Sequence, residues 1–386
     1  MNKIAEQIKK EFIERYNHEP YLYFSPGRIN LIGEHVDYND GFVMPGAIDK
    51  GSYYAVALNN SDTINFYSVD FDESLSLHIS EVKKMDNWKN YVLSVLNEFV
   101  LAGKEIKGFD CVLGGDIANG AGMSSSAAVE GGMAFSLNEL CGYGFSRKEL
   151  ALLCQRAEHN YPNVKSGIMD QYANMFGKDD HVMILDCRSV THEYLPLALG
   201  NYSIVLINTK VHHSLASSAY NQRRKECEEG LNILKEHLQI TSFRDLKSTD
   251  ELVKVKDKMS DEVYKRCLYV TGEILRTQKA AELLKAKDIT SFGELMFETH
   301  EGLRDLYEVS CKELDFLVAH AKKDDAVAGS RLMGGGFGGC TINIIQNDHK
   351  ENFLKEILAS YKNEFDIDAE VFEVRPVAGT HEIKPA

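Results

Sequence analysis

The sequence predicts a mixed α+β protein built from two domains. Its 386 residues are enough for two domains of ordinary size. Short runs of β-branched and aromatic residues, bounded by Gly or Asn, alternate with stretches of helical periodicity. Apolar residues make up 44% of the chain and charged residues 26%, so both domains can bury a core.

The N-terminal half is expected to mix helices and strands. At its start Ile4, Ile8 and Phe12 follow i, i+4 spacing with charges between them, which predicts a surface helix and not a signal peptide. The further elements are strands at 51–58 and 107–113 and helices at 88–101, 126–141 and 147–159. The apolar face of helix 88–101 is expected to carry Tyr91, Val92, Val95, Leu96, Phe99 and Val100.

The C-terminal half is expected to be richer in helix. A strongly apolar strand at 202–208 opens it. The elements after it are helical regions at about 214–236 and 260–323, strands at 326–333 and 340–345, a helix at about 349–363 and a strand at 369–374. The change of character near 190–200 predicts two domains, 1–195 and 196–386.

Composition excludes several classes of function. A net charge of −15 repels the phosphates of DNA and RNA, so no nucleic-acid partner is expected. A nucleotide site in such a chain needs local neutralisation by backbone N–H groups, a basic side chain or Mg²⁺. The eight cysteines are scattered without a CxxC pair, which argues against zinc and for a reducing compartment. No apolar stretch is long enough to span a membrane, so a cytoplasmic protein without a membrane partner is expected.

A glycine- and serine-rich motif, GGDIANGAGMSSSA at 114–127, lies between an expected strand and an expected helix. Glycines allow close backbone approach, and the free N–H groups at a helix start attract phosphate. The hydroxyls of Ser124, Ser125 and Ser126 can bind phosphate oxygens or Mg²⁺. The motif is not a Walker A loop. The alternative interpretation is a flexible turn with a serine N-cap.

A second glycine run, GGGFGG at 334–339, contains the pattern G-x-G-x-x-G. A strand is expected directly after it, at 340–345, whereas the dinucleotide-binding fingerprint requires a helix there. The run therefore predicts a hairpin, either lying close to a bound group or without a ligand.

A third segment places Arg28, Glu34, His35 and Asp37 within ten residues. Such a density of polar groups suits recognition of hydroxyls, because carboxylates accept O–H bonds. A metal site at His35 and Asp37 lacks an obvious third ligand. A solvated charged loop is the other alternative.

Together these segments resemble the galactokinase family within the GHMP small-molecule kinases. The resemblance rests on RINLIGEHVDY at 28–38, GAGMSSSA at 120–127, SGIMDQ at 166–171, HSLASSAY at 213–220 and RLMGGGFGGC at 331–340. It implies a ribosomal-protein-like α+β domain followed by a ferredoxin-like α+β domain, with the active site between them. It also implies that the last strand packs back onto the first domain.

The resemblance further implies transfer of the γ-phosphate of ATP to the C1 hydroxyl of galactose, giving galactose 1-phosphate, the first committed step of galactose metabolism in the Leloir pathway. Asp170 matches the catalytic aspartate and Arg28 the arginine beside the reacting hydroxyl. The sugar-binding positions are Glu34, His35, Asp37, Gly167 and Tyr220. The ATP-binding positions are Gly120, Ala121, Gly122, Met123, Ser124, Ser125, Ser126 and Trp88, and the Mg²⁺ positions are Ser126 and Glu158.

Several questions stay open at this point. Asp170 can either take the proton of the hydroxyl or orient it. Trp88 can line the adenine pocket or anchor helix 88–101. An N-acetylgalactosamine kinase, a non-catalytic galactose and ATP sensor, and another GHMP kinase for mevalonate or homoserine are the alternative functions. A monomer that binds galactose and ATP is the expected working form.

Overall fold

The computed structural model describes residues 2–85, 87–118, 120–161, 165–212 and 216–384. Two motifs named above lie partly outside this description: Asn119 of the glycine- and serine-rich motif, and 213–215 of the stretch 213–220.

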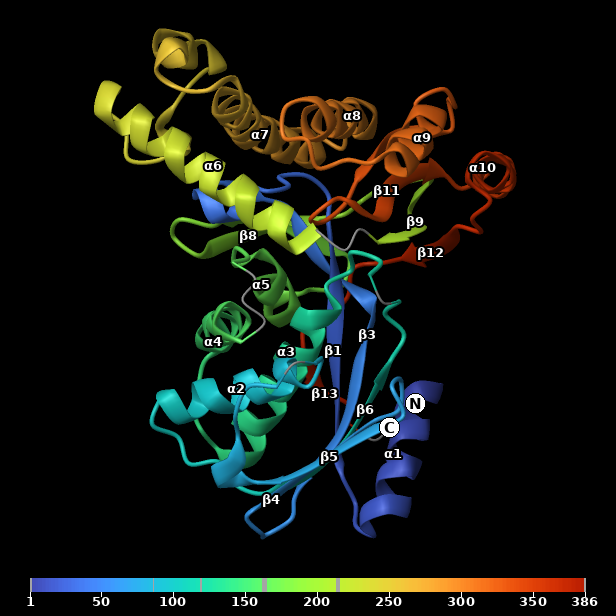
Figure 1. Ribbon diagram of the computed structural model, residues 1–386. Coiled ribbons are helices and arrows are strands. Elements are labelled where there is room, and N and C mark those ends of the chain that lie inside the picture. The colour runs from blue at the N-terminus through green and yellow to red at the C-terminus, as the bar shows by residue number, and fades with distance from the viewer. Residues whose placement is uncertain (1, 86, 119, 162–164, 213–215, 385–386) are drawn as a thin grey trace.

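The first part of the molecule is a six-stranded sheet, ordered β13-β1-β3-β6-β4-β5, with helices on both faces (Figure 1). Its strands are β1 (Tyr21–Asn30), β3 (Pro45–Leu58), β4 (Thr63–Ser68), β5 (Glu73–His78), β6 (Phe109–Gly115) and β13 (His381–Glu382). Its helices are α1 (Lys3–Tyr16), α2 (Asn90–Leu101), α3 (Ser125–Cys141), α4 (Arg147–Asn160) and α5 (Met169–Phe176).

Strand alternation assigns each face of this sheet its own core. Successive side chains of a strand point to opposite faces. Leu22 and Phe24 of β1 therefore pack with Ile8 and Phe12 of α1, while Tyr23 between them packs with the helices on the other face. The chain end returns to this sheet, since Tyr23 and Phe24 of β1 pair with β13.

A small three-stranded sheet, ordered β2-β7-β8, lies beside the first. Its strands are β2 (Phe42–Val43), β7 (His181–Asp186) and β8 (Thr191–Pro196).

The last part of the molecule is a four-stranded antiparallel sheet, ordered β10-β11-β9-β12, with helices around it (Figure 1). The strands are β9 (Tyr202–His212), β10 (Val327–Leu332), β11 (Gly338–Gln346) and β12 (Glu370–Val374). The helices are α6 (Ala216–His237), α7 (Asp261–Lys285), α8 (Ile289–Asp305), α9 (Lys312–Ala321) and α10 (Lys350–Phe365). Four 3₁₀ turns complete the described structure: Asp37–Asn39, Ile79–Glu81, Phe243–Asp245 and Thr249–Lys258.

An apolar core joins the two parts. One buried cluster contains Ile29 and Met44 from the first part together with Leu206 and Ile342 from the sheet of the second. Burial of apolar surface is the main favourable term in such a contact. This shared core fixes the relative position of the two sheets, and with it the groups that lie between them.

The structure confirms most of the expected elements and corrects two. The region 260–323 is three helices, because Lys287 and Glu308 adopt left-handed backbone conformations, at φ 60° and 56°, and end α7 and separate α8 from α9. Val100 is 52% exposed and so does not belong to the buried face of α2. It is the penultimate residue of the helix, which ends at Leu101. The eight cysteines are free thiols.

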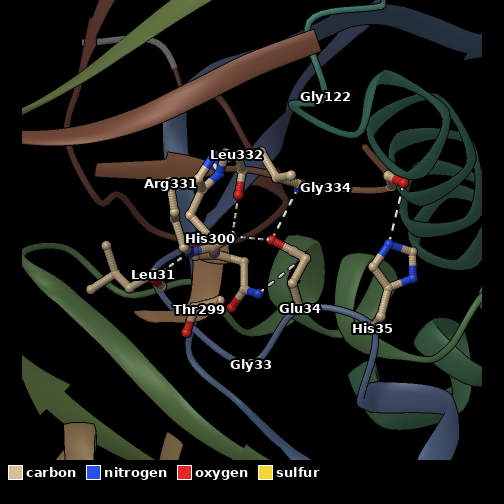
Figure 2. Close-up of polar contacts among 12 residues, drawn as sticks. Leu31, Gly33, Glu34, His35, Gly122, Thr299, His300, Arg331, Leu332 and Gly334 are labelled. Atoms are coloured by element: carbon tan, nitrogen blue, oxygen red, sulfur yellow. Dashed lines mark hydrogen bonds and ion pairs between the residues drawn. The ribbon is translucent and has the colours of Figure 1, made fainter. Parts of the chain in front are cut away.

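A buried ion pair links the two parts (Figure 2). Arg331 of β10, fully buried, places its Nη1 2.6 Å from Oε2 of Glu34, a residue that follows β1 in the chain. The same guanidinium donates to the carbonyls of Leu31, Asn30 and Leu332. Glu34 also accepts the N–H of Gly334 at 3.0 Å. The charges are thus paired and hydrogen-bonded, as buried charges must be.

Arg331→Met tests this link. The substitution leaves Glu34 charged, buried and without its main partner, so we expect the free energy of unfolding to fall by about 3–5 kcal/mol. The double variant that combines Arg331→Met with Glu34→Gln removes the unpaired buried charge, so it should regain part of the lost free energy of unfolding. Urea unfolding measures both. Arg304→Met is the control, because its pair with Asp305 is exposed and should contribute about 0–1 kcal/mol. Equal losses of unfolding free energy in Arg331→Met and Arg304→Met would contradict a special role for the buried pair.

Candidate functional site

The candidate site is centred on a two-pronged ion pair between Arg28 and Asp170. Nε of Arg28 lies 2.7 Å from Oδ1 of Asp170, and Nη2 lies 2.8 Å from Oδ2. Strand β1 supplies the arginine and the first turn of α5 supplies the aspartate. Such planar pairs are among the strongest and most directional hydrogen bonds in proteins. The geometry fixes both side chains at one place between the two parts of the molecule.

The glycine- and serine-rich motif wraps around this pair. Nη1 of Arg28 donates to the carbonyl of Gly122, and the backbone N–H of Arg28 donates to the carbonyl of Met123 at 3.0 Å. Gly120 and Gly122 have φ of 70° and 73°, a conformation that glycine adopts at little cost. Ala121 and Met123 are buried and anchor the loop in the core shared by the two parts.

Ser124 does not act as a capping residue. It precedes α3 in a left-handed conformation, φ 60°, and its side chain makes no capping bond. Its hydroxyl donates instead to Oδ2 of Asp170. The N-cap alternative is therefore wrong, and the first N–H groups of the 17-residue helix α3 have no partner within the helix. That arrangement suits an anion.

Ser126 and Glu158 meet at the other side of the same loop. The hydroxyl of Ser126 donates to Oε1 of Glu158 at 3.2 Å, and Ser166 and Gln171 donate to Oε2. Burial raises the pKa of Glu158, and Asp170 adds repulsion in the same direction, while these hydrogen bonds oppose it. A hydroxyl and a buried carboxylate fit Mg²⁺, which usually takes few protein ligands beside phosphate oxygens and water. Among the described residues no group of three or more His, Cys, Asp or Glu is placed to hold a metal.

A cavity of about 140 Å³ opens beside Asp170, and we call it the acidic cavity. It is lined by Arg28, Glu34, His35, Asp37, Glu158, Ser166, Gly167, Met169, Asp170, Tyr220, Gly334 and Gly335. It therefore brings together every residue for which the sequence predicted a catalytic or sugar-binding role. The lining as a whole comes from five separated segments of the chain: 28–37, 158, 166–170, 220 and 334–335.

Gly167 is needed at the wall of this cavity. A Cβ at this position would lie 1.9 Å from Oδ2 of Asp37, far inside van der Waals contact. The missing side chain lets the carboxylate of Asp37 approach the backbone of the segment before α5. Asp37 there accepts the N–H groups of Tyr38 and Met169.

The carboxylates of the acidic cavity titrate differently. Burial, together with repulsion from Asp170 and Glu34, raises the pKa of Asp37 to about 7. Burial would also raise the pKa of Glu34, but Arg331 and Arg28 reverse the effect and lower it. Burial opposes the charge of Arg28, yet the neighbouring carboxylates raise its pKa overall. Glu34 is consequently ionised at neutral pH, while Asp37 is divided between its two forms.

His35 and Tyr220 form an aromatic wall. Their rings lie 5.2 Å apart between centroids. Both nitrogens of His35 are occupied: Nδ1 lies 2.7 Å from the hydroxyl of Tyr38 and Nε2 lies 3.2 Å from the carbonyl of Gly335. His35 has φ 60°, a strained conformation for a residue with a side chain.

A second cavity, of about 300 Å³, lies on the other side of Ser126, and we call it the aromatic cavity. Its lining includes Trp88, Phe71, Tyr91, Ser125 and Ser126. The rings of Phe71 and Trp88 stack at 4.8 Å with an interplanar angle of 18°. Trp88 lines this cavity and also packs against the hydrophobic core. A flat planar group suits this wall.

A third cavity lies elsewhere. It measures about 600 Å³ and is lined mainly by 197–204 and 373–376, at the connections that enter and leave the four-stranded sheet. None of the predicted site residues lines it. No helix in the described part of the chain is long and apolar enough to cross a membrane.

Sequence reasoning missed several residues of the site. Ser166 belongs to the motif SGIMDQ at 166–171 but was assigned no role, although its hydroxyl donates a hydrogen bond to Oε2 of Glu158. Arg331 also lay in a quoted motif, but its partner Glu34 is 297 residues away. Tyr307 lies in no motif and reaches the site through Tyr38, at 2.8 Å between hydroxyls. Pairings at such separation leave no local pattern in a single sequence.

Comparison with known proteins covers nearly the whole chain. Family models match for the galactokinase galactose-binding signature at 10–58, the GHMP kinase N-terminal domain at 90–178 and the GHMP kinase C-terminal domain at 280–363. The chain is 41% identical to the galactokinase of Clostridium perfringens strain SM101, over 95% of this chain and 96% of the relative. It is 39% identical to that of Fusobacterium nucleatum, over 99% and 100%.

Solved structures agree. The crystal structure of Lactococcus lactis galactokinase complexed with galactose matches with a TM-score of 0.95 at 34% identity, over 99% of this chain and 100% of that one. The mevalonate kinase of Methanococcus jannaschii matches with a TM-score of 0.66 at 21% identity, which shows a shared fold alone. The mixed α+β architecture with N- and C-terminal GHMP domains is thereby confirmed, and the chain belongs to the galactokinase family of the GHMP kinases.

Proposed function

We propose that the protein transfers the γ-phosphate of Mg·ATP to the C1 hydroxyl of α-D-galactose, giving galactose 1-phosphate. One observation carries the proposal: the acidic and aromatic cavities adjoin, and the Ser126–Glu158 hydrogen bond joins a wall of one to a wall of the other. A sugar in the first and a nucleotide in the second would meet at the Arg28–Asp170 pair. The galactokinase relatives favour galactose over the alternative substrates and over a sensor.

The acidic cavity suits a neutral ligand with many hydroxyls. An ionised carboxylate accepts hydrogen bonds and donates none, and sugar hydroxyls can donate to it. Glu34 and Asp37 are proposed to hold sugar hydroxyls, with His35, Tyr220 and the backbone at Gly167 completing the contacts. A cavity of about 140 Å³ is small, which limits the ligand to about the size of one monosaccharide.

Phosphoryl transfer depends mainly on positioning and on neutralising charge. The glycine- and serine-rich loop at 120–126, at the N-terminus of α3, is proposed to hold the phosphates, and the aromatic wall at Trp88 the adenine. Ser126 and Glu158 would hold Mg²⁺, which neutralises phosphate charge when bound. Arg28 stabilises negative charge that develops at the transferred group, and Asp170 accepts or orients the hydroxyl proton.

The working state proposed here is a cytoplasmic monomer that has no nucleic-acid or membrane partner, with domains at 1–195 and 196–386. The net charge of −15 disfavours binding to the phosphate backbone of a nucleic acid. The eight free thiols support a reducing compartment. Size-exclusion chromatography with light scattering tests the monomer.

ADP release by the purified protein with Mg·ATP tests the function directly. The panel contains galactose, glucose, N-acetylgalactosamine, mevalonate and homoserine, and turnover on galactose alone is the expected result. Turnover on N-acetylgalactosamine would change the substrate and keep the chemistry. Galactose binding by calorimetry without ADP release on any compound would favour the sensor.

Asp170→Asn should lower kcat by at least about a hundredfold, the scale of general base catalysis, while galactose still binds. Asparagine keeps a side chain of the same shape and a hydrogen bond to Arg28 but cannot take a proton. Asp170→Ala serves as the comparison, because it removes orientation as well. Near wild-type kcat in Asp170→Asn with loss in Asp170→Ala would mean that Asp170 orients the hydroxyl. Full activity in both would overturn the assignment.

Galactose affinity should rise with pH. Asp37 has a pKa of about 7 in the free protein, so its ionised fraction grows about tenfold between pH 6 and pH 8. The ionised carboxylate accepts two sugar hydroxyls where the protonated one donates to one of them. We therefore expect the Kd for galactose, measured by calorimetry without nucleotide, to fall by up to about tenfold across this range. Asp37→Asn should bind more weakly at pH 8 and show a flat profile. A flat wild-type profile would contradict the role of Asp37.

A further inference from the structure

A chain of four side chains leads from the acidic cavity to helix α6. The hydroxyl of Tyr38 lies 2.7 Å from Nδ1 of His35 and 2.8 Å from the hydroxyl of Tyr307. The hydroxyl of Tyr307 in turn lies 3.2 Å from Sγ of Cys227 on α6. At the other end, Nε2 of His35 lies 3.2 Å from the carbonyl of Gly335. Figure 2 shows this last contact beside Glu34.

Elementary hydrogen-bond chemistry sets the direction of the whole chain. A carbonyl only accepts, so Nε2 of His35 carries a proton and donates to Gly335. In a neutral imidazole Nδ1 is then the acceptor, and the hydroxyl of Tyr38 must donate to it. Tyr38 has one proton, so its oxygen accepts from Tyr307. The proton of Tyr307 is used in turn, and the thiol of Cys227 donates to its oxygen.

The surroundings keep the imidazole neutral and the chain free of water. Burial lowers the pKa of His35 to about 4. Tyr307 and Cys227 are fully buried, and His35 is 3% exposed. The ring of Tyr307 also packs on the rings of His35 and Tyr269, at 4.9 and 4.7 Å between centroids. Loss of the Tyr307 hydroxyl alone would therefore leave the packing of its ring unchanged.

We propose that Tyr307 is a positioning residue of the sugar site: by donating to Tyr38 it directs the Tyr38 proton to Nδ1 of His35, and together with the carbonyl of Gly335 at Nε2 it holds His35 in the tautomer that carries its proton on Nε2. The inference rests on the proposed function, in which His35 contacts the sugar. It follows that His35 offers the sugar no acceptor: Nδ1 accepts from Tyr38, and the single proton on Nε2 can only be shared between the carbonyl of Gly335 and an acceptor on the sugar. The sugar hydroxyl that contacts His35 must then accept a hydrogen bond, whereas the hydroxyls that contact Glu34 and ionised Asp37 must donate one.

Tyr307→Phe tests the proposal by kinetics. The variant removes one donor and keeps the ring, so Tyr38 is free to rotate and His35 to change tautomer. We expect the KM for galactose to rise about five- to tenfold, the range of one lost hydrogen bond, with kcat and the KM for ATP unchanged. Tyr38→Phe should give a similar rise, and the double variant little more, because the two act through one chain.

Tyr361→Phe is the matched control. Tyr361 is equally buried and donates to the carbonyl of Thr209 at 2.9 Å, within the core of the four-stranded sheet. Its loss should lower stability without changing the KM for galactose. A rise in KM of the same size in Tyr361→Phe would show a general effect of lost stability and overturn the proposal.

Nitrogen NMR of the histidines gives a readout independent of activity. The 13 histidines are distinguished by comparison with His35→Gln. In the wild-type protein His35 should show a protonated Nε2 and an unprotonated Nδ1, and in Tyr307→Phe a mixture of the two tautomers. A proton on Nδ1 in the wild type, or unchanged His35 signals in Tyr307→Phe, would overturn the inference. Absence of galactose turnover in the wild type would count against the proposed function and leave this spectroscopic test intact.

Discussion

The buried pair of Glu34 and Arg331 is the constraint on which the rest of the site depends. It takes two charges out of water, which costs several kcal/mol for each ion unless every donor and acceptor is satisfied. The structure meets that requirement by using strand ends from both parts of the molecule: Arg331 donates to the carbonyls of Asn30 and Leu31, and Gly334 donates to Glu34. The carboxylate of Glu34 is therefore held at a fixed place only when both parts are assembled.

The same region concentrates negative charge, and its arrangement limits the cost. Four carboxylates line the acidic cavity, at Glu34, Asp37, Glu158 and Asp170. Arginines face two of them directly, while Glu158 is held by hydroxyl and amide donors. Burial and repulsion from Asp170 and Glu34 leave Asp37 with a raised pKa. One cavity thus contains both ionised acceptors and a carboxyl that changes form near neutral pH, and a hydroxyl-rich ligand can use both.

The two cavities of the proposed phosphoryl transfer site differ in the kind of surface that they offer. The acidic cavity is polar and small, and the aromatic cavity is flat-walled and larger. Between them lie an arginine, a glycine-rich loop and a helix N-terminus, which are the groups that neutralise phosphate in an acidic protein. The chain of His35, Tyr38, Tyr307 and Cys227 extends this organisation away from the cavity and into α6.

The sequence by itself determined the local parts: glycines that permit left-handed turns at 120 and 122, the apolar alternation of the strands, and the density of polar groups from Arg28 to Asp37. These features act over a few residues, so periodicity and composition reveal them. It could not reveal β1 as a buried strand, the division of 260–323, or any partner of Glu34 and Tyr38. The pairing of Glu34 with Arg331 and of Tyr38 with Tyr307 spans 297 and 269 residues, so packing of distant segments sets the choice of partner. Tertiary structure alone decided which polar groups are paired, how deeply they are buried, and hence how they titrate.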